Sequence, residues 1–528
     1  MSSFPWLTII GVIPLIGAAV LMVLPKTSTE LAKRIALCVS VIPLLLVIAM
    51  ALRFDANSTS EFQFVESHEW IRTFGISYSV GVDGISLVLI ALSVILVPLV
   101  ILAAWNDADD AIGSVKGYFA LLLVLETFMV GVFAATDVFL FYVFFEAMLI
   151  PVYFLIGRYG GPGRQYAAVK FLLYSLVGGL LMLAALIGLY VVSAQELGTG
   201  TFDFTTLTNL NIDPGTQKLL FLGFFIAFAI KAPLVPFHTW LPDAAAASTP
   251  GTAVLLVGVL DKVGTFGMIK VCLPIFPAAS EFYAPVIIVL CVVGIIYGAL
   301  LAIGQTDLKR LIAYTSVSHF GFIGLGIFAM TTQGQSGSTF YMLNHGFSTG
   351  ALFLIAGFLM TRRGSRLIAD FGGVYRVAPV LAGLFLIAGL SSLSLPGMSS
   401  FISEFLVLVG TFEKYTVAAV IATLGIVLAA LYILLMYQRT MTGPVKDGCE
   451  KMTDVKGREA LAIIPMLVLL VALGVYPKPV LDVVNPAVER VMQQTGQRDP
   501  LPTVKPLAAE EAKERVSNVS SSIEGGAR

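Results

Sequence analysis

The stretch Lys231-Ala-Pro-Leu-Val-Pro-Phe-His-Thr-Trp-Leu-Pro-Asp243 interrupts an apolar run that begins at residue 219. It places an ammonium group beside Pro233 and Pro236, at a point where a membrane helix would otherwise continue. A charge at the centre of a membrane helix costs roughly 2.5–3.5 kcal/mol, and each proline removes a helical hydrogen bond. Irregular backbone at membrane depth persists only inside protein or beside a watery cavity. The stretch therefore predicts a broken helix with Lys231 on an internal, water-lined path.

The composition indicates a polytopic membrane protein. Of 528 residues, 57% are hydrophobic and 12% are charged, with a net charge of −1, whereas soluble domains carry about 25% charged residues. The charge balance gives no case for nucleic-acid binding. The four cysteines form no C-x-x-C pair, which argues against metal and iron–sulfur sites. No nucleotide-binding glycine motif is found, so we expect no cofactor in this chain.

Apolar runs of about 20 residues, enough to span a bilayer, predict an all-α fold with about fourteen transmembrane helices. The runs lie at 4–24, 31–53, 82–105, 115–135, 137–157, 167–193, 218–241, 250–273, 283–303, 308–330, 339–361, 377–410, 415–438 and 459–476. The first run is longer than the apolar core of a signal peptide, which has about 7–15 residues, and it lacks the basic start, so we expect it to be retained. The twelfth contains Leu395-Pro396-Gly397, which predicts a second break.

Each broken helix is the fourth in a block of five, helices four to eight and nine to thirteen. Because the broken helices are five positions apart in the order of helices, the two blocks cross the membrane in opposite orientations, as inverted transporter repeats do. The expected divisions are three N-terminal helices (1–112), a first repeat (113–273), a second repeat (282–440), a loop with the last helix (441–476) and a polar tail (477–528).

Basic residues indicate the orientation of the chain. Lys and Arg gather in one set of alternate connections, for example at Arg362, Arg363 and Arg366, which places that set in the cytoplasm. Both termini are then expected in the periplasm, and the long polar tail favours a bacterial inner membrane over a mitochondrial one. Within the tail, residues 507–519 have helical character, and the Ser/Gly-rich end is typical of disorder.

Ionisable side chains lie inside several predicted helices, where such residues are functional by default. Burial shifts the pH at which carboxylates and amines exchange protons toward neutrality. Histidine titrates near neutral pH without such a shift. A relay with water between successive groups is therefore expected. Its candidate members are Glu146, Lys231, Lys262, His319, His345 and Glu404.

Structural interpretations of the same residues stay open. Glu146 and Lys231 can form an ion pair that only fixes helix packing, and buried histidines can simply be hydrogen-bonded. Four further candidates are secondary, because Asp261 can pair locally with Lys262, Glu126 can pair or snorkel, and polar anchors are ordinary near helix ends. These four are Glu126, His238, Asp243 and Asp261.

Four stretches resemble the antiporter-like membrane subunits of respiratory complex I, which are relatives of Mrp-type cation/proton antiporter subunits. They are the opening stretch, Phe144-Phe-Glu-Ala-Met-Leu-Ile-Pro151, Asp307-Leu-Lys-Arg-Leu-Ile-Ala-Tyr-Thr-Ser-Val-Ser-His319 and Asn344-His345-Gly346. The resemblance covers roughly residues 80–440. It implies fourteen core helices and two inverted five-helix repeats, with a half-channel in each.

The resemblance also implies roles for individual residues. Glu146 matches the carboxylate of a functional pair with Lys231, and Lys262 matches the central relay lysine. The two candidate histidines fit the central polar axis of the family. Glu404 lies at the place of the terminal proton-exchanging residue, where a lysine is usual in sister subunits and in Mrp-type subunits.

We therefore expect a proton-translocating membrane subunit of NADH:quinone oxidoreductase, a translocase component with no redox centre of its own. FMN, iron–sulfur clusters, NADH and quinone are expected in partner subunits. The expected partners are the other complex I membrane subunits, including two sister antiporter-like subunits, the peripheral redox arm and membrane lipids. An Mrp-type antiporter subunit and a non-conducting structural subunit remain the alternatives.

Overall fold

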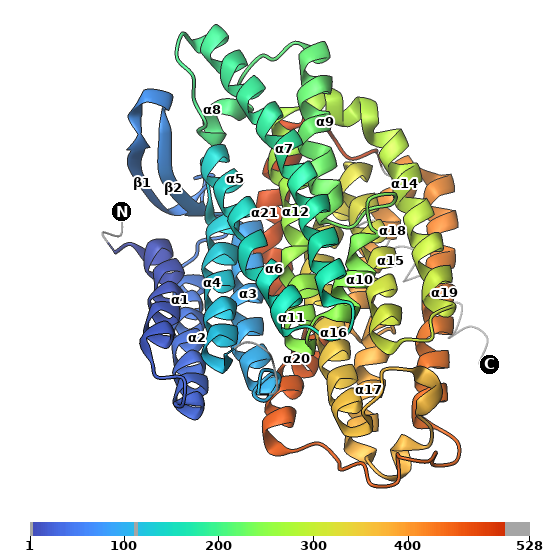
Figure 1. The fold of residues 1–528 in the computed structure, drawn as a ribbon. Coiled ribbons are helices and arrows are strands. Elements are labelled where there is room, and N and C mark those ends of the chain that lie inside the picture. The colour runs from blue at the N-terminus through green and yellow to red at the C-terminus, as the bar shows by residue number, and fades with distance from the viewer. Residues whose placement is uncertain (1–3, 110–113, 502–528) are drawn as a thin grey trace, which may run out of the picture. The chain divides into compact units, whose positions relative to one another are not determined.

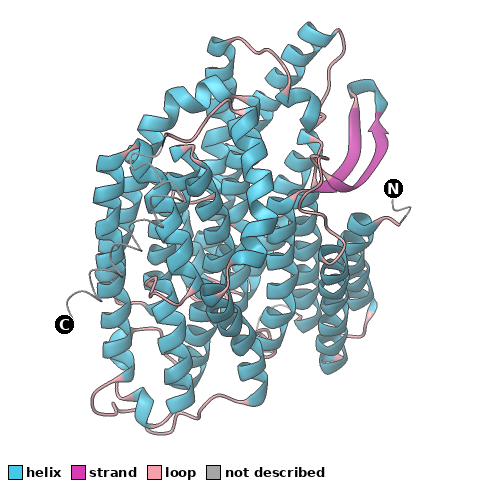
Figure 2. Ribbon diagram, turned by 180° about the vertical axis from the view of Figure 1, so that it is seen from behind, coloured by secondary structure: helices cyan, strands magenta, loops and turns pink. Residues whose placement is uncertain are grey.

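The computed structural model describes residues 4–109 and 114–501, and most of these residues are helical (Figures 1 and 2). The N-terminal helices are α1 (Trp6–Val23), α2 (Thr29–Ala51) and α3 (Gly84–Ala103). Helices four to eight comprise α4 (Val115–Ala134), α5 (Val138–Ala147), α6 (Leu149–Tyr159), α7 (Arg164–Leu197), α8 (Phe204–Thr208), α9 (Pro214–Lys231), α10 (Trp240–Ala247), α11 (Pro250–Leu255), η2 (Leu256–Leu260), α12 (Lys262–Gly267), η3 (Met268–Cys272) and α13 (Leu273–Ile275). Helices nine to fourteen comprise α14 (Pro277–Ile303), α15 (Leu308–Ala329), α16 (Thr332–Arg363), η4 (Ile368–Asp370), η5 (Val374–Arg376), α17 (Pro379–Ser392), α18 (Ser399–Lys414), α19 (Thr416–Met441) and α20 (Gly457–Val475). A further helix, α21 (Lys478–Gln494), follows α20.

Within the described ranges, twelve helices are long and apolar enough to cross a membrane. The other two predicted spans are the seventh and the twelfth, and both are broken where the sequence predicted it. Helix α9 ends at Lys231, and α10 resumes at Trp240; α17 ends at Ser392, and α18 resumes at Ser399. Each break contains proline, which cannot donate the hydrogen bond that would extend a helix. The all-α, polytopic fold with two broken helices is confirmed.

Three spans lie inside the bundle with almost no outward face. Helix eight (Pro250–Ile275) and α16 are buried along the whole of their apolar window, and α15 is nearly so, whereas less than half of the window is buried in α1, α2 and α19. Apolar side chains on the more exposed spans can face lipid, whereas polar side chains on the inner spans are shielded from it. The inner spans carry the central candidates Lys262, His319 and His345.

Helix eight is not a uniform α-helix. π-helical turns, η2 and η3, lie on either side of the short α-helical segment α12 that begins at Lys262. A π-turn adds a residue to the helical repeat and frequently occurs at functional sites. Hydropathy carries no information about this hydrogen-bond register, so the sequence did not predict these turns.

Two further elements lie outside the predicted helices. Strands β1 (Gln63–Ile71) and β2 (Ile76–Val82) form an antiparallel hairpin through η1 (Arg72–Phe74), and β2 packs on α4 and α5. Helix α21 occupies part of the segment expected to be only a polar tail, and its buried valines pack on α3 and α16. The helix predicted at 507–519 lies outside the described residues.

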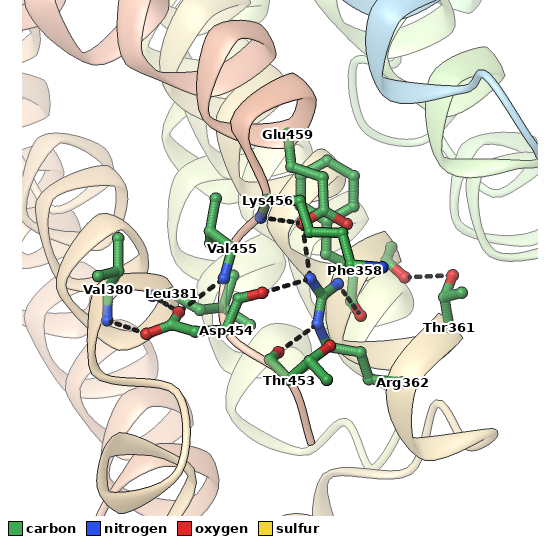
Figure 3. Close-up of polar contacts among 11 residues, drawn as sticks. Phe358, Thr361, Arg362, Val380, Leu381, Thr453, Asp454, Val455, Lys456 and Glu459 are labelled. Atoms are coloured by element: carbon green, nitrogen blue, oxygen red, sulfur yellow. Dashed lines mark hydrogen bonds and ion pairs between the residues drawn. The ribbon is translucent and has the colours of Figure 1, made fainter. Parts of the chain in front are cut away.

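Polar contacts fasten the loop before α20 to α16 and α17 (Figure 3). Arg362 donates hydrogen bonds to the Asp454 carbonyl (3.1 Å) and to Glu459 Oε2 (2.6 Å). The Asp454 carboxylate accepts from the N–H groups of Val380 and Leu381, at 2.9 Å each. Partial burial acts to raise the pKa of Asp454, but these N–H donors and the Arg362 charge hold it below its ordinary value. The loop thereby caps the first turn of the second broken helix.

We expect Arg362→Ala to destabilise the protein by about 3–5 kcal/mol, because Glu459 would be left largely buried without its partner. Thermal unfolding of the purified protein checks this, and acidification through the pKa of Asp454 should weaken the same attachment. Lys478→Ala is the matched control, since its pair with Asp482 is exposed and should matter little. Equal shifts in the two variants would contradict the expectation.

Candidate functional site

Glu146 and Lys231 lie in one neighbourhood without forming an ion pair among the described residues. Glu146 is partly buried near the end of α5, and its Oε1 has no hydrogen-bond partner in the described chain. Lys231 is the last residue of α9, and its side chain is almost completely buried. Its Nζ lies 4.5 Å from the centroid of the Phe145 ring. The two groups interact electrostatically. The structure thus presents the pair in a separated arrangement.

Gly179 of α7 makes room for the Glu146 carboxylate. A Cβ atom at this position would lie 1.8 Å from Glu146 Oε1, far inside van der Waals contact. Any side chain at Gly179 would therefore displace the carboxylate. Sequence reasoning missed this glycine, because a glycine within an apolar helix is ordinary for membrane helix packing.

Lys262 contacts His345 directly in the centre of the bundle. The Lys262 Nζ lies 2.6 Å from His345 Nδ1 and donates a hydrogen bond of 2.6 Å to the Val257 carbonyl. Both side chains are fully buried. Val257 lies in the π-turn η2, so the irregular helix supplies an acceptor for the amine. The local pair with Asp261 that the sequence left open is not formed, since the amine is directed elsewhere.

The polar row consists of the candidates Glu146, Lys231, Lys262, His319, His345 and Glu404. Its last part runs from His345 toward Glu404. The rings of His345 and His319 meet edge to face, with their centroids 5.3 Å apart. The His319 Nε2 lies 3.3 Å from the Tyr432 hydroxyl. Tyr432 and Tyr341 both interact electrostatically with Glu404, which is buried on α18. Two tyrosine hydroxyls therefore lie between the histidines and the terminal carboxylate.

The second helix break places the Ser394 hydroxyl in the neighbourhood of Tyr341 and Glu404. Ser394 has a φ of +58°, a left-handed conformation that is unfavourable for a residue with a side chain. Its hydroxyl acts electrostatically on both Tyr341 and Glu404, although it has no hydrogen-bond partner among the described residues. Such backbone outliers cluster at functional sites. Sequence reasoning missed Ser394 and both tyrosines, and only the following Pro396-Gly397 gave a signal.

The secondary candidates differ in their surroundings. Asp243 is held by Lys170 (2.7 Å) and Arg310 (2.8 Å), which supports its structural interpretation. His238 is buried in the break after α9. Glu126 is completely buried on α4, with neither carboxylate oxygen hydrogen-bonded in the described chain and no charged side chain there acting on it. The structure does not connect Glu126 or Asp243 to the row.

The row consists of carboxyl, amine and imidazole groups, all of which can donate or accept a proton. In the described part of the chain, no three His, Cys, Asp or Glu side chains are grouped to hold a metal ion. Several buried atoms of the row have no partner among the described residues, including Lys231 Nζ, His319 Nδ1 and His345 Nε2. Buried polar atoms normally bond to protein or ordered water, so water can connect the gaps.

Two family models match this sequence. The one described as "NADH:quinone oxidoreductase/Mrp antiporter, TM" matches residues 135–429, and the one described as "NADH-ubiquinone oxidoreductase chain 4, amino terminus" matches residues 12–132. The chain belongs to this family of antiporter-like membrane subunits.

Within the family, the similarity to subunit M and chain 4 covers nearly the whole chain. It is 54% identical over 537 residues to NADH-quinone oxidoreductase subunit M of Mycobacterium tuberculosis, covering 96% of this chain and 97% of that protein. It is 39% identical over 482 residues to NADH-ubiquinone oxidoreductase chain 4 of Arabidopsis thaliana, covering 91% and 95%. The resemblance to the antiporter-like membrane subunits of complex I is thereby confirmed.

Solved structures agree with this assignment. A chain of respiratory complex I from Thermus thermophilus superposes with a TM-score of 0.84 at 31% identity, covering 93% of this chain and all of that chain. A chain of the Mrp complex of a Dietzia species has a TM-score of 0.81 at 22% identity, covering 94% and 100%, which shows the shared fold alone. The Mrp similarity is secondary.

We expect Gly179→Ala to reduce NADH-driven proton pumping while the protein still folds, because the clash falls on the movable end of Glu146. Acidification of inverted membrane vesicles, normalised to the amount of assembled complex, measures the effect. Gly11→Ala is the control, since a Cβ there has open space around it. Unchanged pumping in Gly179→Ala would show that the position of the carboxylate is unimportant.

Proposed function

We propose that this chain is the M-type proton-translocating subunit of NADH:quinone oxidoreductase and that its buried polar row carries the protons. The observation that carries the proposal is the near-continuous series of buried polar side chains from Lys262 to Glu404. The proposed proton-carrying residues are Glu146, Lys231, Lys262, His319, His345 and Glu404.

In the first half, the working event is a change in the separation of Glu146 and Lys231. A nearby carboxylate stabilises the lysine ammonium, and its withdrawal in a low-dielectric interior favours release of the proton. The separated arrangement, with Lys231 Nζ against Phe145, corresponds to the releasing state. The Glu146 carboxylate lies beside Gly179 at the end of a flexible side chain. It can therefore move toward Lys231 to form the paired state.

In the second half, the proton passes between groups that already face one another. The Lys262 amine lies at hydrogen-bond distance from His345 Nδ1, so a proton can move directly between these nitrogens. His345 then exchanges with His319, and the Tyr432 hydroxyl is the next polar group. Glu404 is the terminal group, which exchanges its proton with the aqueous phase.

The redox chemistry belongs to other subunits in this proposal. FMN, iron–sulfur clusters, NADH and quinone are held by the partner subunits, and oxidation of NADH with reduction of quinone drives the proton movement here. The chain lies in a bacterial inner membrane beside two sister antiporter-like subunits, with both termini in the periplasm. The basic residues in alternate loops support this orientation.

The unpaired interior groups argue against a purely structural subunit. Charges that only pin helices together are expected to form ion pairs, since an uncompensated buried charge is strongly destabilising. Lys231 Nζ and Glu146 Oε1 instead have no hydrogen-bond partner among the described residues. Glu404 and the full-length similarity to subunit M argue against an independent Mrp-type antiporter.

Lys231→Ala and Glu146→Ala should each strongly reduce NADH-driven proton pumping while the complex assembles, because each removes one member of the switching pair. The measurement is proton uptake by inverted vesicles, with NADH:ferricyanide activity as the assembly reference. Lys218→Ala is the matched control, since this lysine of α9 contacts the Phe282 ring outside the row. Normal pumping in both pair variants would refute the relay.

Tyr432→Phe should lower the pumping rate several-fold, because it removes only the hydroxyl that faces His319 Nε2. The same vesicle assay applies. Tyr437→Phe serves as the control on the same helix, because Tyr437 packs against Phe385 away from the row. A rate equal to that of the parent protein would exclude the Tyr432 hydroxyl from the path.

A further inference from the structure

Asp261 is a buried carboxylate that the proposed row does not use. Its side chain is completely inaccessible, and neither carboxylate oxygen has a hydrogen-bond partner in the described chain. The adjacent Lys262 does not satisfy it, because that amine contacts Val257 and His345. A buried, unsatisfied carboxylate costs several kcal/mol. Asp261 therefore does not act as a simple structural ion-pair partner of its neighbour.

Asp261 and Lys262 point to different sides of helix eight. Successive residues of an α-helix are about 100° apart, and residues three apart share a face. Gly264, three residues after Asp261, lies against the end of α9: a Cβ there would be 2.4 Å from the Phe228 carbonyl oxygen and 2.7 Å from the Ala232 nitrogen. Asp261 thus faces the end of α9, where Lys231 lies.

The charges around Asp261 agree with this geometry. Both Lys231 and Lys262 act electrostatically on the Asp261 carboxylate. No other ionisable group in the described chain acts on it. The carboxylate is therefore within electrostatic range of both the lysine of the first half and the lysine that contacts His345 in the second half.

We propose that Asp261 is a further proton-carrying residue that connects Lys231 with Lys262. This inference rests on the proposed function. It identifies the residue that links the first half, Glu146 and Lys231, with the second half, which begins at Lys262. The Lys231 ammonium gives a proton to the Asp261 carboxylate, which becomes a carboxylic acid. The acid then gives its proton to the neutral Lys262 amine, which becomes an ammonium, so that charge and protons balance at each step. The carboxylate thereby serves as an intermediate acceptor, so that the two lysines need not exchange the proton directly.

The test compares Asp261→Asn with Asp261→Glu in the intact complex. Asparagine keeps the volume but cannot carry a proton, so pumping per NADH in inverted vesicles should fall at least threefold. Glutamate restores the carboxyl group and should retain at least half of the pumping. Ser93→Ala is the control, a buried hydroxyl on α3 that bonds only to the Leu89 carbonyl of its own helix.

The outcomes separate this inference from the proposed function. If Lys231→Ala and Glu404→Gln lose pumping while Asp261→Asn keeps it, Asp261 is not a carrier, although the relay stands. If none of the three loses pumping, the relay itself fails. Equal loss in the asparagine and glutamate variants, or failure of the asparagine variant to assemble, would assign Asp261 to packing and overturn the inference.

Discussion

The contact between the Lys262 amine and His345 is the central interaction of the buried row, and it joins helix eight of the first block to α16 of the second. An amine and an imidazole at the centre of an apolar bundle lose their hydration, and only hydrogen bonds made inside the protein offset that loss. The π-turn before Lys262 provides one of these bonds through the Val257 carbonyl, and α16 provides the other. The irregular register of helix eight and the complete burial of α16 thus meet at this one interaction.

The rest of the row is organised by helix breaks. Each break ends a helix beside an ionisable or polar side chain, Lys231 in one block and Ser394 in the other. A continuous helix would satisfy its own backbone and turn such side chains at fixed intervals around its axis. A break releases backbone polar groups and lets a side chain enter the interior. A strained backbone such as that at Ser394 and an unpaired buried amine such as that of Lys231 are costly for stability and are typical of functional sites.

Much of the fold could be predicted from local sequence. Apolar length identified the spans, and Pro233, Pro236 and Pro396 identified the breaks, because both depend on neighbouring residues alone. The hairpin β1–β2 and helix α21 were missed, since their apolar positions are few and become buried only against distant helices. Tyr341 and Tyr432 were also missed, because an aromatic residue in an apolar helix does not reveal where its hydroxyl points.

The sequence by itself determined that the chain spans a membrane many times, that two helices break and that ionisable residues are buried. These properties follow from hydrophobic transfer and from the missing proline N–H, which act along the chain. Only the tertiary structure decided that Lys262 contacts His345 rather than Asp261, and that Asp261 faces the end of α9. The reason is rotational: adjacent residues on a helix face different neighbours, and helix packing decides which neighbours those are.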